Sequence, residues 1–378
     1  MTAGVVSLPF RGPKSQPANL PQSPKTVIFQ PMHLDHILAE LAQGRPAALA
    51  RAISIVENGR SGFEQLLASI HPRQGHARRI GITGPPGAGK STLTERLVLA
   101  FRAEGLRVAV VAVDPTSPFT GGALLGDRIR MESIALDKDV YIRSMATRGF
   151  LGGLATSTRE VCDVIDAAGF DRILVETVGV GQSELDVTRT ADTTLLVLVP
   201  ESGDGIQALK SGVMEAADIY AVNKADRPGA DRLRQEIEIT LGIRTGNAYR
   251  NVPAHHGALK STERKAVLTA GDAEAAVWLQ PVLGTSAAKG EGIDELITAL
   301  DAHHRWLDRT GNLAHRRRER LRDRTREVVS RHALAWLKEE TDTERRIAER
   351  LDDIAAGRVS PYEVAAEVLD HLRQGVRA

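Results

Sequence analysis

Short apolar runs alternate with helical stretches along the middle of the chain. The runs are rich in β-branched residues and apolar at consecutive positions; they cover residues 80–83, 108–113, 140–143, 173–176, 194–199, 219–223 and 282–285. Strands that are apolar on both sides are typical of a parallel sheet covered by helices on each face. Their alternation with helices predicts a doubly wound, mostly parallel α/β domain over residues 78–305.

Helical periodicity dominates the flanks of this region. Before it, apolar residues recur at intervals of three and four, which predicts a helical module over residues 33–77. After it the spacing is again helical. Ser360, Pro361 and Glu363 have the order of an N-cap, a first helical position and the closing acid of a capping box. We therefore expect residues 306–378 to form a helical extension.

Residues 1–32 contain six prolines and no acidic side chain. Prolines at this density prevent a regular helix, so we predict a flexible leader. A targeting peptide is the alternative, because basic, acid-poor leaders can serve that purpose. The lack of an amphipathic stripe favours the flexible leader.

Composition and charge exclude several classes of function. The 49 Lys and Arg residues nearly balance the 48 Asp and Glu residues, which argues against a nucleic-acid partner. The longest apolar runs are far shorter than the roughly 18 residues of a membrane span. A single cysteine, Cys162, excludes disulfide scaffolds and cysteine-based zinc sites, and it indicates a reducing, cytoplasmic location.

A phosphate-binding motif follows the first apolar run. It fits G-x-x-x-x-G-K-[ST] between a strand and a helix, and it consists of Gly84, Pro85, Pro86, Gly87, Ala88, Gly89, Lys90 and Ser91, followed by Thr92. Glycines let backbone N–H groups surround phosphate oxygens, and the helix N-terminus favours the anion. We expect Lys90 to pair with the β- and γ-phosphates and the Ser91 hydroxyl to bind Mg²⁺.

A guanine-reading motif follows a later strand. Asn223, Lys224 and Asp226 lie at the carboxyl end of the sixth apolar run, where ligands of parallel sheets bind. A carboxylate there can accept two hydrogen bonds from guanine N1–H and N2–H₂, a donor pair that adenine lacks. Ser286 and Ala287, after the last run, complete the pattern. These residues predict GTP and GDP as ligands rather than ATP.

Further acids are candidates for the metal and the γ-phosphate. Asp114 and Glu176 each end an apolar run, and Asp127 lies in a glycine-rich segment. Mg²⁺ takes oxygen ligands, some of them through water, so these acids and Ser91 form the candidate metal site. A capping or solvated role is the alternative for each acid. The N–H of Gly179 is the predicted γ-phosphate sensor.

The residue after Gly179 is Val180 rather than a glutamine that could orient water as in Ras, and Gln182 comes two positions later. We expect slow intrinsic hydrolysis and a partner that completes the site. The catalytic candidates are Lys90, Asp114, Asp127, Glu176 and Gln182.

Several longer runs resemble a known family. They are DPTSPFTGG at 114–122, LGDR at 125–128, IRSM at 142–145, TRG at 147–149 and ETVGVGQSE at 176–184. Together with the two nucleotide motifs they resemble the MeaB/ArgK family, the GTPase chaperones of adenosylcobalamin-dependent acyl-CoA mutases. The resemblance runs from residue 34 to the C-terminus and is densest over 80–226.

The resemblance implies a P-loop domain of the SIMIBI class, a helical N-terminal module, and a C-terminal extension through which homodimers form. It implies binding of GTP and Mg²⁺, association with a mutase, and gating of adenosylcobalamin loading. The family's metal-proximal acids correspond to Asp114, Asp127 and Glu176, and its third switch to residues 203–210. Two alternatives stay open: a kinase of an amino-acid transport system, and a nickel metallochaperone, which the lack of His- or Cys-rich tracts disfavours.

An arginine-rich run is the remaining prominent feature; it contains Arg316, Arg317, Arg318, Arg320, Arg322, Arg324 and Arg326. Nucleic-acid binding is one interpretation. The interleaved acids Glu319, Asp323 and Glu327 favour a solvated helix of i,i+3 and i,i+4 pairs that serves as a dimer or partner helix. Minor expectations are that His255, His256, His303 and His304 are surface or loop residues, that Cys162 is buried, and that Trp278, Trp306 and Trp336 are packing anchors.

Overall fold

The computed structural model describes residues 32–114, 131, 133–146, 153–177, 183–200, 213–244 and 277–375. Its centre is a seven-stranded sheet in the order β3-β2-β4-β1-β5-β6-β7, in which every pair of neighbours is parallel. The strands are β1 (Arg78–Thr83), β2 (Val108–Asp114), β3 (Val140–Ala146), β4 (Arg172–Thr177), β5 (Thr193–Leu198), β6 (Ile219–Val222) and β7 (Val282–Gly284). The predicted α/β P-loop fold is confirmed, and each predicted strand is present.

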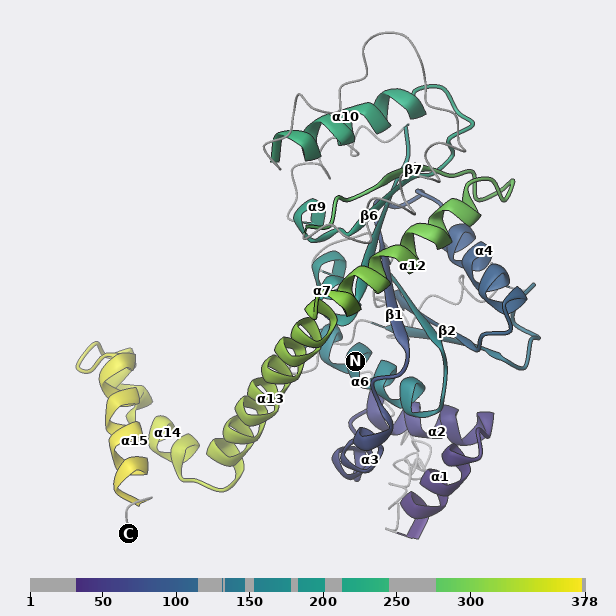
Figure 1. Ribbon diagram of the computed structural model, residues 1–378. Helices are drawn as coiled ribbons and strands as arrows, with labels where there is room; N and C mark the ends of the chain where they lie inside the picture. The colour runs from purple at the N-terminus through teal and green to yellow at the C-terminus, as the bar shows by residue number, and fades with distance from the viewer. Residues whose placement is uncertain are drawn as a thin grey trace, which may run out of the picture.

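Helices cover both faces of the sheet (Figure 1). On one face α4 (Lys90–Ala103) and α12 (Ile293–Arg309) share a core with Val108 and Val110; on the other, α6 (Gly153–Ala167) packs on Ala109 and Val111. Successive residues of β2 thus enter opposite cores, as strand geometry requires. The other helices of the domain within the described residues are α7 (Ser183–Thr190), α9 (Val213–Ala216) and α10 (Ala230–Arg244).

The N-terminal helices extend the core on the α6 side. They are α1 (Met32–Ala42), α2 (Pro46–Glu57) and α3 (Phe63–Ile70), followed by the short 3₁₀ turn η1 (His71–Arg73). Ala52, Ile53 and Leu66 are fully buried in the cluster that also contains Val161 and Ile165 of α6. The helical module therefore buries its apolar face against the α/β domain.

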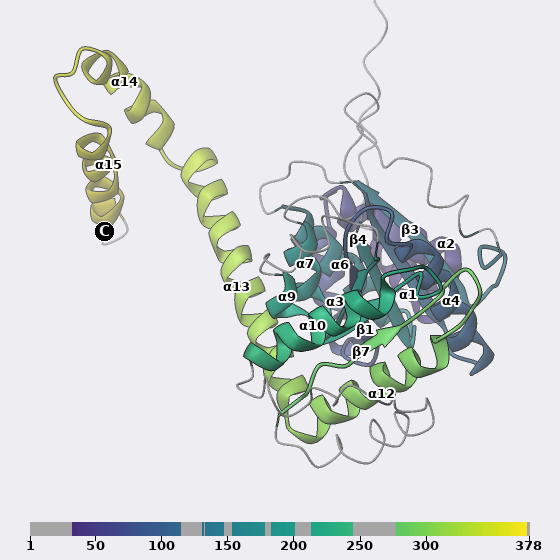
Figure 2. The same ribbon diagram turned by 90° about the horizontal axis from the view of Figure 1, so that it is seen from above.

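The C-terminal helices form an arm that leaves the domain (Figures 1 and 2). It consists of α13 (Asn312–Glu339), α14 (Thr343–Ala355) and α15 (Pro361–Gly375). The predicted capping box is confirmed: Glu363 N donates to Ser360 Oγ over 3.2 Å, and Ser360 N donates to Glu363 Oε2 over 2.7 Å. No helix in the described part of the chain is long and apolar enough to cross a membrane.

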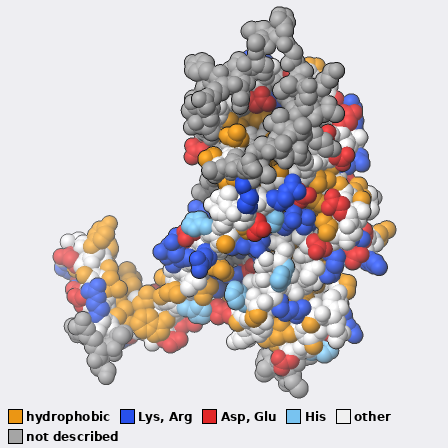
Figure 3. Space-filling model, in the orientation of Figure 1, with side chains coloured by type: hydrophobic (Ala, Val, Ile, Leu, Met, Phe, Trp, Pro, Cys, Tyr) orange, Lys and Arg blue, Asp and Glu red, His pale blue; other side chains and the backbone are white. Residues whose placement is uncertain are grey.

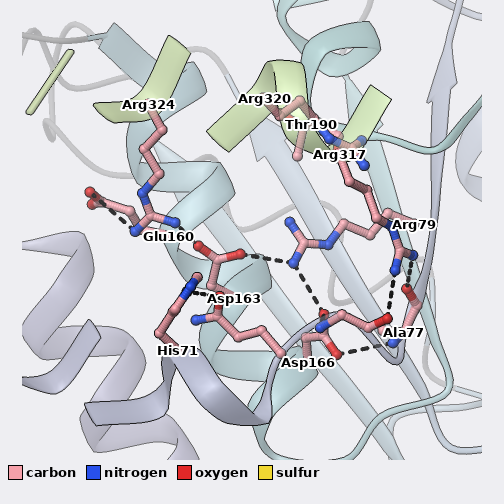
Figure 4. A network of polar contacts seen from close by, with 12 residues as sticks. His71, Ala77, Arg79, Glu160, Asp163, Asp166, Thr190, Arg317, Arg320 and Arg324 are labelled. Atoms are coloured by element: carbon pink, nitrogen blue, oxygen red, sulfur yellow. Dashed lines mark hydrogen bonds and ion pairs between the residues drawn. The ribbon is translucent and has the colours of Figure 1, made fainter. Parts of the chain in front are cut away.

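Arginines in the first half of α13 bind acids and backbone carbonyls of the domain (Figure 4). Arg317 donates to Asp192 and to Ala77 O, while Arg320 donates to Asp192 and to Ala191 O, just after α7. Arg324 pairs with Asp163 on α6. The prediction of a solvated helix is therefore wrong for this segment, because these arginines face nearly buried carboxylates.

Two of the predicted pairs along α13 are present: Glu319 pairs with Arg322, and Asp323 pairs with Arg326. Glu327, which was predicted to pair with Arg331, accepts two hydrogen bonds from Arg159 of α6, at 2.7 and 2.8 Å. Glu327 therefore also connects α13 to the domain.

Asp192 is a nearly fully buried acid of this network, with a side chain 1% exposed. Burial alone would raise the pKa of its carboxyl, but the guanidinium groups of Arg320 and Arg317 outweigh burial and hold that pKa well below its usual value. Its ionised form is therefore stabilised by folding. The resulting stability is complete above the unfolded-state pKa of about 4 and is lost as the pH falls from there through the lowered folded-state pKa.

We expect the Asp192→Asn substitution to lower the free energy of unfolding by about 3–5 kcal/mol at neutral pH, because it removes one partner of a buried ion-pair cluster. The difference from the wild type should shrink below about pH 4. Denaturant unfolding at several pH values measures both effects. Asp370→Asn, which removes an exposed pair with Arg373, is the control and should change stability little. Equal effects of the two substitutions would contradict this account.

Four smaller expectations can be compared with the structure. Cys162 is buried as predicted, and burial raises the pKa of its thiol to about 12. Trp278 and Trp306 are buried as predicted, but Trp336 is 39% exposed, so the prediction was wrong there. It was also wrong for His303, which is fully buried on α12 between Thr193 and Asp218. His255 and His256 lie outside the described residues.

Candidate nucleotide site

The phosphate-binding loop connects the central strand β1 to α4. Its glycines have conformations that only glycine adopts easily: φ is 140° at Gly84, 73° at Gly87 and 82° at Gly89. A Cβ atom on Gly84 would lie 2.0 Å from Val197 O, and one on Gly89 would lie 2.5 Å from Asn223 Nδ2. Because these two glycines carry no side chain, the loop can pack closely against β5 and the guanine motif.

Lys90 is the first residue of α4 and is only 6% exposed. Its Nζ donates to Gly84 O over 2.8 Å and to Pro85 O over 3.0 Å. These bonds hold the ammonium group against the loop, close to the N-terminus of α4. A cation at this place is suited to the β- and γ-phosphates of a nucleotide bound on the loop.

Two candidate metal ligands meet beside the loop. The hydroxyl of Ser91 donates to Glu176 Oε1 over 2.6 Å, and Glu176 is 5% exposed at the end of β4. Thr177 donates to Thr83 over 3.1 Å and so joins the ends of β4 and β1. This pair of hard oxygen donors fits Mg²⁺, which takes a few protein oxygens and keeps several waters.

The other predicted ligands are only partly covered by the structure. Asp114 ends β2, and the residue before it is paired in register with Thr177, so its backbone lies at the same edge of the sheet as Glu176. The side chain of Asp114, together with Asp127, Gly179 and Gln182, lies outside the described residues. Among the residues that are described, no group of three or more His, Cys, Asp or Glu could hold a metal ion.

Asn223 joins the phosphate loop to the loop after β7. Its Nδ2 donates to Ala88 O over 2.8 Å, and its Oδ1 accepts from Ala287 N over 3.1 Å. The side chain is 2% exposed, so its amide is a structural connection between the two halves of the site. Lys224, next to it, has φ 55° and is the one non-glycine residue with positive φ among those described. The backbone turns sharply here to present Asp226.

Asp226 is the last residue of the guanine motif, and its side chain is one-third exposed. Its Oδ1 accepts from Ser286 Oγ over 3.1 Å, and its Oδ2 lies 3.0 Å from Lys289 Nζ. The bond from Lys289 is the main cause that lowers the pKa of this carboxyl. The two motifs predicted from sequence are thus brought together, as expected for a guanine pocket.

Two residues of the site were not predicted from the sequence. Lys289 lies three positions after Ser286, so its place in the same loop was a usable signal. Arg96 lies on α4 and donates to Ala287 O over 3.0 Å and to Ala288 O over 3.1 Å. Arg96 and Ala287 are 191 residues apart in the sequence, so no local sequence pattern indicates this contact.

Comparison with known proteins shows that the segment containing this site matches a known protein family. A family model described as the methylmalonyl-CoA mutase-associated GTPase MeaB matches residues 49–342, which include both nucleotide motifs and all of α13. The chain belongs to the MeaB family. It is accordingly a GTPase, as the two motifs predict.

Individual relatives agree with membership of the MeaB family. The GTPase ArgK of Escherichia coli is 37% identical over 310 residues, which are 79% of this chain and 85% of ArgK. The mitochondrial methylmalonic aciduria type A homolog of Mus musculus is 32% identical over 346 residues, 88% of this chain and 78% of the mouse protein. A solved structure named LAO/AO transport system kinase matches with a TM-score of 0.60 and 27% identity, and it covers 92% of this chain and 99% of its own.

Proposed function

We propose that this protein is a GTP-dependent chaperone of an adenosylcobalamin-dependent acyl-CoA mutase, methylmalonyl-CoA mutase or a close relative. The main support for this proposal is the match to the model of the mutase-associated GTPase MeaB over residues 49–342, a continuous span that includes the nucleotide site and α13. In this proposal the protein assists the loading of adenosylcobalamin and protects the mutase, while GTP hydrolysis times its action. A cytoplasmic location is part of the same proposal.

The residues of the site divide the work of hydrolysis. Backbone N–H groups of the loop 84–92 and the N-terminus of α4 bind the phosphates. Asp226 accepts the guanine donors, and Asn223, bonded to Ala88 O, fixes the distance between base and phosphate loop. Lys90 transfers its hydrogen bonds from carbonyls to phosphate oxygens and stabilises charge as the γ-phosphoryl group leaves.

Mg²⁺ would be held by Ser91 and Glu176, with Asp114 and Asp127 as further candidates, and would supply neutralisation of phosphate charge. Glu176 is buried at the end of a core strand, so its carboxylate is held in place before nucleotide binds. Gln182 is the remaining candidate for orienting the attacking water.

The arm offers a surface for protein contacts. Its exposed apolar side chains are Leu321, Val329, Leu334, Trp336, Leu351, Tyr362 and Leu369. In Figure 3 hydrophobic side chains cover much of the outer part of the arm, whereas Lys and Arg gather where it joins the domain. Exposed apolar area of this kind is typical of an interface. We assign it to a homodimer contact or to the mutase.

Stimulation of GTP turnover by a mutase tests this function. We expect GTP hydrolysis by the full chain to be slow alone and to rise when one purified acyl-CoA mutase is added. Methylmalonyl-, isobutyryl-, ethylmalonyl- and 2-hydroxyisobutyryl-CoA mutases should be compared in parallel. The Trp336→Ser substitution should reduce the stimulation without changing the basal rate, and Lys338→Ala, also on α13, is its control. If no mutase changes turnover or forms a complex, the chaperone function is excluded.

A second candidate is a protein kinase of an amino-acid transport system. It is favoured by the name of the solved relative that covers 92% of this chain. Transfer of a labelled γ-phosphate from ATP or GTP to an amino-acid-binding protein would support it. Asp226 argues for GTP over ATP as the donor in either case.

A further inference from the structure

Lys289 is bonded to the atom that guanine would use. Asp226 presents two oxygens, and in this structure each has a protein donor: Ser286 Oγ at Oδ1 and Lys289 Nζ at Oδ2. A guanine base that is read by this carboxylate brings two donors of its own, N1–H and N2–H₂. The base must therefore share both oxygens or displace one of the donors already present.

The two protein donors differ in how easily they move. Ser286 is 3% exposed, and its N–H donates to Glu291 O over 3.0 Å, so its hydroxyl is held beside Oδ1. Lys289 has a side chain 52% exposed on a flexible four-carbon stem. Its loop keeps its shape through backbone bonds that do not involve the ammonium group, such as Ala225 N to Thr285 O over 2.9 Å. Lys289 is therefore the donor that can leave.

We propose that Lys289 competes with the guanine base for Asp226 Oδ2, and so weakens GTP and GDP binding and speeds nucleotide release. This inference rests on the proposed reading of guanine by Asp226. Lys289 is then a specificity-determining residue, because in the absence of nucleotide its ammonium group occupies the position at Asp226 Oδ2 that the 2-amino group of guanine would take. The only other charge beside the ammonium group among its described neighbours is Glu291, on the same loop.

The expected effect is modest because the ion pair is exposed to solvent. Removal of the competing donor should tighten GDP binding about two- to fivefold, the range of exposed pairs. Salt screens such pairs, so the gain should shrink as ionic strength rises. Inosine diphosphate lacks the 2-amino group and can bind through one oxygen only. Its affinity should gain less than that of GDP.

Calorimetric titration of the full chain tests the proposal. GDP and inosine diphosphate are titrated at low and high salt into the wild type, Lys289→Ala, Lys289→Arg and the remote control Lys338→Ala. Of these variants, we expect only Lys289→Ala to bind GDP more tightly than the wild type does. Its gain in affinity should be smaller for inosine diphosphate, and its gain for GDP should be smaller at high salt. Unchanged or weaker GDP binding by Lys289→Ala, or an equal gain for both nucleotides, overturns the proposal.

The role of Asp226 is tested separately in the same series. If Asp226→Asn leaves the preference for guanine unchanged, the assignment of Asp226 fails whatever Lys289 does. If Asp226→Asn changes that preference but Lys289→Ala does not tighten GDP binding, only the competition by Lys289 is wrong.

Discussion

Replacement of Lys90 by alanine is expected to reduce kcat for GTP hydrolysis by about 10²–10³-fold, the loss typical of removing one preorganised donor. The ammonium group is nearly buried and held by the carbonyls of Gly84 and Pro85, so it approaches the phosphates without a large change of position. Its interaction with the γ-phosphate strengthens as charge develops in the transition state. Affinity for GTP should fall less than kcat.

Single-turnover hydrolysis and nucleotide titration separate these two effects. Lys338→Ala removes an ammonium group of the same kind from α13, far from the loop in sequence, and should leave both values unchanged. Thermal unfolding of each variant shows whether the fold is kept. A folded Lys90→Ala protein that hydrolyses GTP at the wild-type rate would rule out this site as the place of the reaction.

The Asp226→Asn substitution should exchange the preference for guanine for a preference for xanthine. The asparagine amide is a donor where the carboxylate was an acceptor, so it faces the 2-amino group of guanine with like polarity. Xanthine carries a carbonyl oxygen at that position and can accept the new hydrogen bond. We expect GDP affinity to fall on the order of 10²-fold, because sites that bond a specific group reject analogues strongly.

Titration with GDP and xanthosine diphosphate measures this exchange. Asp231→Asn on α10 is the matched control, since Asp231 is 89% exposed and pairs only at the surface with Arg234. Its nucleotide affinities should match those of the wild type. Loss of both GDP and xanthosine diphosphate binding, with the fold intact, would show that Asp226 supports the loop rather than reads the base.

Much of the fold and part of the site could be predicted from the sequence. Continuous apolar runs identified all seven strands, because a strand buried on both faces has no polar positions to alternate with. The phosphate loop was recognisable because glycines at fixed positions permit backbone angles that other residues avoid. Lys90, Ser91 and Asn223 lie at the ends of strands or at a helix start, where the predicted chemistry placed them.

Two of the errors share one physical cause. His303 and three arginines of α13 carry polar groups that local patterns assign to solvent. Each of them meets a partner that is distant in the sequence; the three arginines are Arg317, Arg320 and Arg324. Arg320 reaches Asp192 across 128 residues. A buried polar group is acceptable once it is paired, so composition cannot exclude it. The prediction for Trp336 was wrong in the opposite sense: this large apolar residue was expected to be a packing anchor, but it faces solvent on the arm.

By itself, the sequence determined which segments become strands and helices, and it determined that the chain binds a guanine nucleotide, because both depend on short-range period and on motifs of neighbouring residues. Only the tertiary structure decided that Asn223 bonds to Ala88 and that Lys289 meets Asp226. It alone also decided that arginines of α13 bind α6, the end of α7 and the residue before β1. These contacts arise when distant segments pack together, and their free energy depends on burial and geometry that exist only in the folded chain.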